Sequence, residues 1–563
     1  MTAVADSGFP PWHREPPPPG SWRALFQWGD PDRSQPPAPA MVRLVMDLLA
    51  MSETDFQTPR RLGLGPVRLA PPRLAHTARR DLEAMLGAGN VQSDDFARLA
   101  AATGKGMLDL LRLRCGLPGP TPDAVLHPRD RHDLVRIVEY CARGGIAVLP
   151  RGGATSVTRA LECPAGGVAL DLRTHMDRIL RFNETSATVT VQPGIRGPRL
   201  EAALNRAPDW LGAAHPHTCG HFPQSFEFST VGGWVATRGA GQNSSYFGKI
   251  EDLVLAQEFV TPAGTIRTLE HPAAATGPDI DQILLGSEGT LGVLAEATLR
   301  VFRLPRAGPR CFSYLFPDWG EALEAAREVL QDGAGAPSLF RLSDPAETEA
   351  ALARHGLRRP ALDAFLGRLG LHPGRRCLLL GWTEGEAGFQ RNLRRRIGRI
   401  CRGRGAVPAT GWPGKAWARS RFQEPYLRDH LLDFGVLVDT LECAASWDGL
   451  ARVHRAVQDR CRARPGTACL AHVSHAYPQG ASLYFVLLAR LDTIPEYQAF
   501  QAGLLDVIRD QGAAMSHHHG IGRMAAPWLA AQLGPVQMDL LRAIKRQLDP
   551  QGIMNPGGTL GLD

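Results

Sequence analysis

A glycine-rich stretch near the middle of the chain constrains its fold more than any other segment. Residues 223–252 read PQSFEFSTVGGWVATRGAGQNSSYFGKIED, with few long aliphatic side chains and many Gly, Ser and Thr residues. Such a segment cannot bury itself by hydrophobic packing alone, but its backbone N–H groups and small hydroxyls suit a polar ligand. Glycine also lets the backbone approach that ligand closely. The stretch predicts a ligand-binding segment, with a plain glycine-rich loop as the alternative.

Two further glycine turns flank this stretch. Residues 146–157, IAVLPRGGATSV, read as a short apolar strand that runs into a Gly-Gly turn with two hydroxyls. Residues 281–301, DQILLGSEGTLGVLAEATLRV, read as a glycine turn that enters a β-rich run. Successive backbone amides in such turns can form a nest for phosphate oxygens. One glycine turn is weak evidence, but three in this order with strands between them strongly favour a phosphate-bearing ligand.

Composition narrows the class of protein. A chain of 563 residues is too long for one core and predicts two or three domains. Its hydrophobic content of 44% and charged content of 21% are typical of a soluble globular protein. The net charge is +7, but no basic run with interleaved aromatic residues is present, which argues against a nucleic-acid partner. The ten cysteines lack metal or redox spacing, so we expect no metal site.

The sequence also bears on location. No apolar run approaches the ~20 residues that a membrane span needs, and the N-terminus does not read as a signal sequence. We therefore expect a cytoplasmic protein, with peripheral contact to a membrane left open. Trp412 and Trp417 lie in an expected loop and are candidates for a membrane-facing surface, although they are as compatible with packing inside the fold.

The secondary-structure pattern predicts an α+β fold. Apolar residues recur at helical spacing between residues 41 and 115, and strands and helices alternate from residue 123 onward. No GxGxxG motif opens a βαβ unit and no Walker loop is present. A nucleotide cofactor, if bound, is therefore not held in the Rossmann manner.

The motifs, in their order, resemble the FAD-binding domain of the vanillyl-alcohol-oxidase-type flavoproteins. They are P-x-G-G-x-T-S-V from Pro150, S-x-E-F-S-T-V-G-G-W from Ser225, T-G-P-D-I from Thr276 and G-S-E-G-T-L-G-V from Gly286. Within that group the chain is similar to the alkyldihydroxyacetonephosphate synthase (alkylglycerone-phosphate synthase) family. The similarity covers nearly the whole chain, and the run SHHHGIGR at residues 516–523 is its most specific further match.

The resemblance implies a domain organisation. It implies a proline-rich N-terminus and helical region over residues 1–115 and a two-subdomain FAD-binding domain over 116–305. An α+β cap domain would span 306–535, and a C-terminal segment, 536–563, would pack back on the FAD-binding domain.

The resemblance also implies the cofactor and the residues that bind it. Relatives that attach FAD covalently often have His near position 154, where this chain has Ala154, so we expect non-covalent FAD. The family has Asp where Gln224 stands, which removes a negative charge. The expected cofactor-binding residues are Pro150, Arg151, Gly152, Gly153, Ala154, Thr155, Ser156, Gln224, Ser225, Ser229, Thr230, Gly233, Thr237, Arg238, Gly241, Glu288, Gly289, Gly292 and Val293.

The family pattern places the chemistry on a tyrosine and several histidines. Tyr484 matches the acid/base tyrosine, and we expect neighbouring histidines or arginines to lower its pKa. His221 matches a histidine close to the flavin. Within the run 517–519 we expect His518 and His519 to be catalytic, without separating the two.

Two arginines of the cap match family positions and are candidates for holding a substrate phosphate. They are Arg341 and Arg428, and each alone is more often a solvated charge. His472 stands where the family has Arg, which could alter recognition of the head group.

The function implied by the resemblance is an exchange reaction in ether lipid biosynthesis. Acyl-dihydroxyacetone phosphate would lose its fatty acid and receive a fatty alcohol, with FAD as a covalent trap rather than a net redox carrier. A homodimer is expected. The alternative is an FAD-linked D-2-hydroxy acid dehydrogenase or oxidase, which HAYPQG at residues 475–480 disfavours because those relatives have His-x-Gly-Asp-Gly-Asn there. A flavin-binding protein without catalysis is the third possibility.

Overall fold

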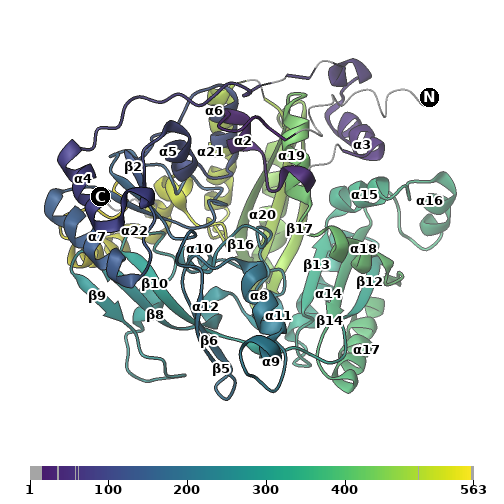
Figure 1. The fold of residues 1–563 in the computed structure, drawn as a ribbon. Helices are drawn as coiled ribbons and strands as arrows, with labels where there is room; N and C mark the ends of the chain where they lie inside the picture. The colour runs from purple at the N-terminus through teal and green to yellow at the C-terminus, as the bar shows by residue number, and fades with distance from the viewer. Residues whose placement is uncertain (1–15, 34–36, 58, 61, 492, 559–563) are drawn as a thin grey trace.

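Three principal β-sheets organise the chain (Figure 1). The computed structural model describes residues 16–33, 37–57, 59–60, 62–491 and 493–558. The first proline-rich residues of the expected N-terminal region, 1–15, lie outside the described residues. In Figure 1 the two smaller sheets lie to the left and the large sheet to the right.

The first sheet has four strands in the order β1-β2-β4-β3. Its strands are β1 (Val91–Gln92), β2 (Ala124–Leu126), β3 (Val148–Arg151) and β4 (Val168–Asp171). Strands β2, β4 and β3 are parallel, and every residue of β2 and β4 is buried, as is usual for parallel strands covered on both faces. Helix α7 (Arg131–Gly144) packs its apolar side chains into the same core as these strands.

The second sheet is antiparallel, in the order β5-β6-β10-β8-β9. Its strands are β5 (Ile179–Asn183), β6 (Thr188–Val191), β8 (Val254–Thr261), β9 (Gly264–Arg267) and β10 (Val293–Arg300). Val260 and Val293 of this sheet share a hydrophobic core with β2, β3 and β4. The two sheets therefore form one body.

Short helices carry the glycine-rich stretch across this body. They are α10 (Val231–Ala236), α11 (Ser244–Phe247) and α12 (Ile250–Leu253). Before them lie α8 (Gly197–Asn205), α9 (Ala207–Trp210) and β7 (His217–Thr218), and after them comes α13 (Ile280–Leu284). Strand β7 pairs with β11 (Phe302–Arg303).

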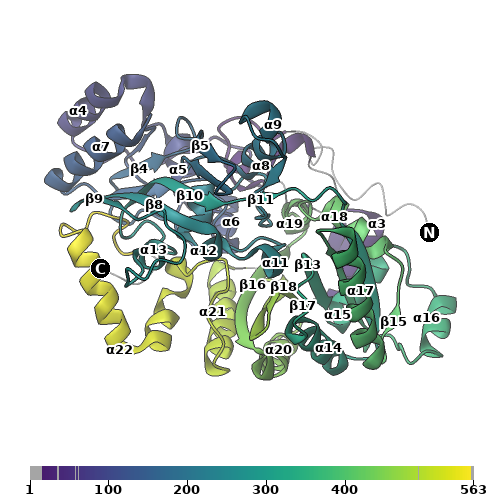
Figure 2. The ribbon, with the colours of Figure 1, turned by 90° about the horizontal axis from the view of Figure 1, so that it is seen from below.

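The third sheet has seven antiparallel strands in the order β15-β12-β14-β13-β17-β18-β16. The strands are β12 (Arg310–Phe316), β13 (Leu339–Ser343), β14 (Cys377–Thr383), β15 (Val407–Pro408), β16 (Val436–Ser446), β17 (Thr467–Tyr477) and β18 (Gly480–Arg490). Four helices pack into the core on one face of this sheet. They are α14 (Trp319–Gln331), α17 (Ala387–Gly403), α20 (Trp447–Arg462) and α21 (Ile494–Asp510). Figure 2 shows two of them, α14 and α20, below the strands.

Successive side chains of a strand point to opposite faces of the sheet, and this determines which residues lie on the face away from the four helices. Leu483 and Phe485 of β18 belong to the core beneath the helices, so Tyr484 between them points to the other face. The same rule puts Glu442 of β16 and His472 of β17 on Tyr484's face, because their chain neighbours lie in that core. That face carries the site described below.

The N-terminal region is mostly helical, apart from residues 62–75, which hold no helix, and one short strand. Its helices are α2 (Trp22–Phe26), α3 (Pro39–Leu49), α4 (His76–Leu86), α5 (Asp95–Ala102) and α6 (Met107–Arg114). Strand β1 interrupts the expected helical pattern, because its two residues pair with β2 and extend the first sheet.

The remaining helices complete the large sheet's surroundings and the chain end. They are α15 (Pro345–Arg354), α16 (Pro360–Gly367), α18 (Trp412–Ser420), α19 (Glu424–Leu432) and α22 (Gly522–Leu548). After α22 the chain returns to the first sheet, where the Val148 N–H donates to the Ile553 carbonyl at 2.8 Å. Across the described residues, no helix is long and apolar enough to cross a membrane.

The expected loop around Trp412 and Trp417 is a helix, so that prediction was wrong. Both residues lie on α18, and Pro413 at the second helical position favours a helix start there. Trp417 packs against Trp382 of β14, with ring centroids 5.7 Å apart. Trp412 remains 47% exposed, so one of the two tryptophans still faces solvent.

Candidate active site

Three polar side chains lie in a row across neighbouring strands. In the register of the sheet, Tyr484 is opposite Glu442 on one side and opposite His472 on the other. The rings of Tyr484 and His472 stack, with centroids 4.9 Å apart and an interplanar angle of 22°. Strand pairing therefore fixes these three groups beside one another.

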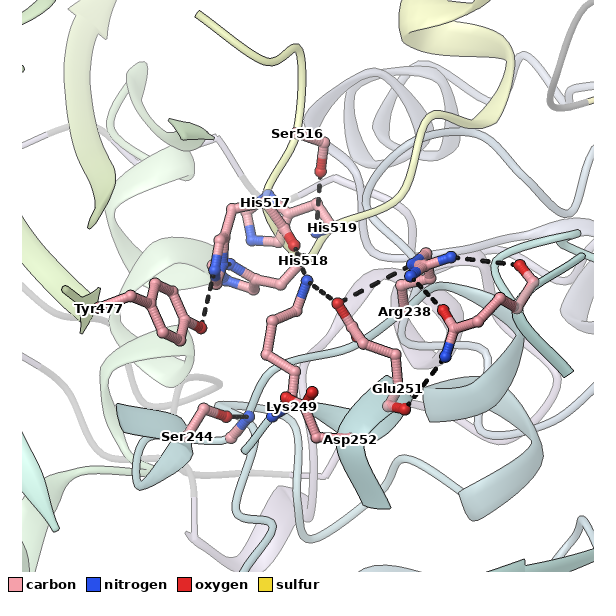
Figure 3. Close-up of polar contacts among 12 residues, drawn as sticks. Arg238, Ser244, Lys249, Glu251, Asp252, Tyr477, Ser516, His517, His518 and His519 are labelled. Carbon is pink, nitrogen blue, oxygen red and sulfur yellow. Dashed lines mark hydrogen bonds and ion pairs between the residues drawn. The ribbon is translucent and has the colours of Figure 1, made fainter. Parts of the chain in front are cut away.

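The histidine run lies over this row. Residues 511–521 join α21 to α22, and residues 516–519 turn tightly, with the His519 N–H donating to Ser516 Oγ at 3.1 Å. The rings of His518 and His519 lie 6.0 Å and 5.6 Å from the Tyr484 ring. The turn keeps the three histidines close together, with Nδ1 of His517 3.1 Å from Nδ1 of His518, while Nε2 of His517 lies 3.0 Å from the Tyr477 hydroxyl (Figure 3).

Burial keeps Tyr484 protonated, contrary to the expectation of a lowered pKa. Burial raises the pKa of Tyr484 to about 12. The surrounding histidines do not offset this effect, because burial lowers the pKa of His518 well below its usual range and also lowers the pKa of His519. Neutral imidazoles supply no positive charge that would favour a phenolate.

Two further histidines are buried close by. Burial lowers the pKa of His221 to about 3, and the charges of His475 and Lys249 add to this effect. Neither ring nitrogen of His221 has a hydrogen-bond partner within the described residues, and its ring packs on Trp234 at 4.8 Å. Burial likewise lowers the pKa of His475 to about 3, and its ring stacks on His517 at 5.2 Å.

One of the two predicted phosphate-binding arginines is already paired. Arg341 Nη2 donates to Glu347 Oε1 at 2.7 Å, and Nδ1 of His472 lies 3.0 Å from the same oxygen. Burial favours the protonated Glu347, but the charges of Arg341 and His472 outweigh it and lower its pKa to about 2. Arg341 is therefore held at the edge of the tyrosine row by a carboxylate.

The other arginine keeps open donors. Arg428 Nη1 donates to the Lys105 carbonyl at 2.7 Å. Its Nη2 is buried and makes no hydrogen bond within the described part of the chain. A buried guanidinium donor without a partner is costly unless a ligand fills it.

The three glycine turns meet in space. A Cβ on Gly152 would lie 2.3 Å from Thr230 Oγ1, and one on Gly153 would lie 2.3 Å from the Phe228 carbonyl oxygen. A Cβ on Gly289 would lie 3.0 Å from Pro150 Cδ. The turn that follows β3 is therefore pressed between the glycine-rich stretch and the segment before β10, and this close approach requires glycine.

Several expected cofactor-binding side chains have partners inside the protein. Arg151 pairs with Asp171 at 2.6 Å, and Gln224 Nε2 donates to the Arg421 carbonyl at 2.5 Å. Arg238 Nη2 donates to the Gln282 side chain at 2.8 Å. Ser229 Oγ accepts from Trp234 Nε1 at 2.8 Å, Thr230 caps α10, and the Thr237 hydroxyl donates to the Gly233 carbonyl. At these positions the backbone, more than the side chain, is available to a cofactor.

The donor set fits a flavin nucleotide. The converging glycine turns offer backbone amides and small hydroxyls suited to a pyrophosphate, at residues 152–156 and at the start of α10. Buried polar atoms that lack partners among the described residues lie around them, namely both nitrogens of His221 and the Ser287 hydroxyl. Such atoms are expected where a polar cofactor belongs.

Sequence reasoning missed several groups around the tyrosine. Lys249 Nζ donates to the His517 carbonyl at 2.7 Å and pairs with Glu251 at 3.0 Å (Figure 3). Glu442, His475 and Tyr477 were also missed. The available signal for Glu442 was a carboxylate between the apolar Leu441 and Cys443 in the strand VLVDTLECAAS, because a charged residue is rarely buried without a partner.

One group of side chains has metal-ligand geometry. Ligand atoms of Glu442, His517 and His518 all lie within 4.8 Å of one another. The Glu442 carboxylate, however, already accepts hydrogen bonds from three backbone N–H groups and from the Ser516 hydroxyl. Its oxygens are therefore engaged in hydrogen bonds to residues 516–519.

Comparison with protein families identifies the cofactor. The family described as "FAD binding domain" matches residues 122–270, and the family described as "FAD linked oxidases, C-terminal domain" matches residues 310–559. These matches confirm FAD as the cofactor. The structure of p-cresol methylhydroxylase with substrate bound has a TM-score of 0.65 at 16% identity, covering 88% of this chain and 99% of that chain, and shows the shared fold.

More similar proteins define the family. A solved alkyldihydroxyacetonephosphate synthase structure has a TM-score of 0.76 at 27% identity and covers 92% of both chains, which confirms the predicted α+β flavoprotein fold. The alkyldihydroxyacetonephosphate synthase of Dictyostelium discoideum is 29% identical over 93% of this chain and 88% of that protein. That of Caenorhabditis elegans is 31% identical over 86% of this chain and 83% of that protein. The chain belongs to the alkyldihydroxyacetonephosphate synthase family.

Proposed function

We propose that the protein exchanges the acyl group of acyl-dihydroxyacetone phosphate for a fatty alcohol, giving the alkyl ether and a free fatty acid. Membership of the synthase family supports this reaction. The observation that carries it is the row of Tyr484, His472 and Glu442 under the histidine turn, in which the phenol has the buried His472 and Glu442 as strand neighbours and the half-buried rings of His518 and His519 at 6.0 Å and 5.6 Å. The exchange involves no net oxidation, so it needs acid/base groups rather than an electron acceptor.

FAD completes this site. When bound, it supplies an electrophilic isoalloxazine ring that holds the substrate carbon during the exchange. Residues 152–156, Thr230 and Gly233 would hold its phosphates, with the backbone contributing most of the contacts. Ala154 lies at φ 54° in the glycine turn and offers no nucleophile, which supports non-covalent binding.

Tyr484 is the proposed proton-transfer residue. Its phenol is protonated at rest, and the positive charge of Arg341 is one influence that favours its ionisation. The His472 ring stacks on its ring, and the rings of His518 and His519 lie 6.0 Å and 5.6 Å away. Imidazoles at these positions can accept or donate a proton when the acid leaves and the alcohol arrives.

Arg428 and Arg341 are proposed to hold the substrate phosphate. The open Nη2 of Arg428 supports a direct contact with a phosphate oxygen. Arg341 contributes positive charge, while Glu347 fixes its position.

Two finer assignments are proposals as well. Val536 and Leu540 are 81% and 62% exposed one turn apart on α22, which supports a homodimer contact along this helix. The exposed ring of Trp412 supports peripheral contact with a membrane. Sedimentation and vesicle flotation of the full chain test these two assignments separately.

A product assay tests the reaction. The FAD-loaded protein is incubated with acyl-dihydroxyacetone phosphate and isotope-labelled hexadecanol, and the products are analysed by mass spectrometry. We expect labelled alkyl ether, an equal amount of free fatty acid and flavin that stays oxidised. Absence of labelled ether, with bleaching of the flavin by D-2-hydroxy acids under anaerobic conditions, would instead establish the oxidoreductase alternative.

A further inference from the structure

The segment that carries the three histidines is held at both ends by buried carboxylates. Glu442, near its start, comes from β16 of the large sheet, and Glu288, near its end, comes from the glycine turn before β10. The two glutamates therefore belong to different halves of the molecule, and the segment spans the boundary between those halves.

Glu442 collects four hydrogen bonds from the start of the segment. It is 1% exposed, and its carboxylate accepts the N–H groups of His517 at 2.6 Å, His518 at 3.1 Å and His519 at 2.9 Å. The Ser516 hydroxyl donates the fourth bond at 2.6 Å. Burial favours the protonated form, but the neighbouring His519 and His517 and the hydrogen bonds from Ser516 and His519 outweigh it and lower the pKa of Glu442.

Glu288 collects hydrogen bonds from the other end. Its carboxylate accepts the N–H groups of Ile521 at 2.7 Å and Gly522 at 3.0 Å. The close fit explains the glycines of the segment, because a Cβ on Gly520 would lie 2.6 Å from Glu288 Oε1. Gly522 lies at φ 52°, and a Cβ there would overlap the Thr158 carbonyl.

Five consecutive or near-consecutive amides thus converge on two fixed carboxylates. Charge-assisted hydrogen bonds of this kind are stronger than neutral ones and restrict backbone rotation. Lys249 adds a third anchor by donating to the His517 carbonyl. With the backbone pinned at residues 517–519 and 521–522, the rings of His518 and His519 keep their contacts with Tyr484.

We propose that Glu442 and Glu288 are positioning residues, which hold the histidine segment against Tyr484 from the cap sheet and from the FAD-binding side respectively. Both act through the backbone of the segment, and Glu288, which the resemblance placed among the cofactor-binding residues, takes this positioning role instead. The kinetic part of the proposal rests on the proposed exchange reaction, whereas the structural part does not.

Residue-resolved hydrogen–deuterium exchange tests the structural part. FAD-loaded Glu442→Gln, Glu288→Gln and Asp123→Asn are compared with the parent protein. Asp123 is a matched control, because its buried carboxylate also accepts two backbone N–H bonds, from Arg73 and Gly167, but far from the histidines in the fold. We expect Glu442→Gln to speed exchange at amides 517–519 by at least about tenfold, and Glu288→Gln to do so at 521–522. Unchanged exchange at those amides would overturn the proposal.

Steady-state kinetics tests whether positioning matters for the reaction. We expect both glutamine variants to lower kcat by about tenfold or more while KM changes by less than about twofold, because substrate binding uses other residues. Asp123→Asn should keep both constants. If Glu442→Gln does not fold, Glu442→Asp retains the charge but withdraws the carboxylate, and faster exchange at 517–519 with lower kcat is expected again.

The two proposals fail in different ways. If no variant and no parent protein forms alkyl ether, the exchange reaction is wrong, and the deuterium-exchange result still decides the role of the two glutamates. If the parent forms ether and the glutamine variants form it at the parent rate, the positioning role is wrong and the proposed function stands.

Discussion

The role of the Tyr484 hydroxyl in proton transfer can be tested by a single substitution. Its hydroxyl is the only part removed by Tyr484→Phe, and the stacking with His472 and His518 should remain. We expect the variant to bind FAD and to unfold at the parent temperature, while kcat falls by roughly 10²–10⁴, the range for a lost general acid or base. The measurement is ether formation beside flavin absorbance.

Tyr314→Phe serves as the control for that experiment. Tyr314 is a buried tyrosine of β12 in the same sheet, but it belongs to the core on the opposite face. Its variant should keep kcat within about twofold. A Tyr484→Phe protein that turns over like the parent would remove Tyr484 from the mechanism.

Arg428 gives a second prediction for a single side chain. Arg428→Met removes the open guanidinium donors but keeps much of the side-chain volume, so kcat/KM for the phosphate substrate should fall by about 10–100-fold, the effect of a lost charged hydrogen bond. Arg399→Met on the exposed face of α17 is the control and should change nothing measurable. Equal kinetics in the two variants would argue against phosphate binding by Arg428.

Residue identities were easier to predict than residue environments. Sequence motifs identified Tyr484, His518 and His519, and the structure brings their rings together. The expectation of a lowered tyrosine pKa failed, because it assumed charged histidines. Whether an imidazole is charged depends on its burial, and burial cannot be read from a run of three histidines.

At the scale of elements, helix α6 carries a pH-sensitive group. Asp109 is buried on this helix, and its Oδ2 has no hydrogen-bond partner within the described residues. Burial, reinforced by Glu162, raises its pKa to about 7 from 3.8. Because the folded state then binds this proton more tightly than the unfolded state, Asp109 makes the protein less stable as pH rises from about 4 to about 7.

Asp109→Asn removes that titration. We expect the variant to gain stability relative to the parent by at least ~1 kcal/mol between about pH 5 and about pH 8, because only the parent must ionise a buried carboxyl. Urea unfolding at several pH values measures the difference in unfolding free energy between variant and parent. The other titrating groups are the same in both proteins, so their contributions cancel in this difference. A difference that does not change with pH would show that Asp109 stays ionised throughout.

Helices and strands were largely predictable where a local sequence signal, such as an apolar run or a helix cap, determines them. Strand β18 coincides with a continuous apolar run, and α14 begins after Asp318, whose side chain caps its first turn, so both can be predicted from local sequence. Helix α18 was missed, because a loop was expected around Trp412, whereas Pro413 and the packing of Trp417 favour a helix. Tertiary contacts decided there against local propensity.

For the whole molecule, the sequence indicated the glycine turns and the strands but not which strand residues pair. The order of three glycine turns predicted a shared ligand, and their close approach in space agrees with that. The pairing of Glu442 with Tyr484 could not be predicted, because strand register depends on residues far apart in the chain, and a shift by one residue would move Glu442 into the helix-covered core.

Buried ion pairs attach the N-terminal region to the segment beside the large sheet, and they give a prediction for the whole molecule. Asp433, which follows α19, is fully buried and accepts hydrogen bonds from Arg23 of α2 at 2.7 Å and from Arg114 of α6. Asp433→Ala leaves both guanidiniums buried without this carboxylate, which costs about 3–5 kcal/mol for a broken buried pair. Calorimetry should therefore show earlier unfolding of the cap and N-terminal region. Asp459→Ala, which breaks the exposed pair with Arg462, should cost less than about 1 kcal/mol, and equal shifts in the two variants would contradict a structural role for Asp433.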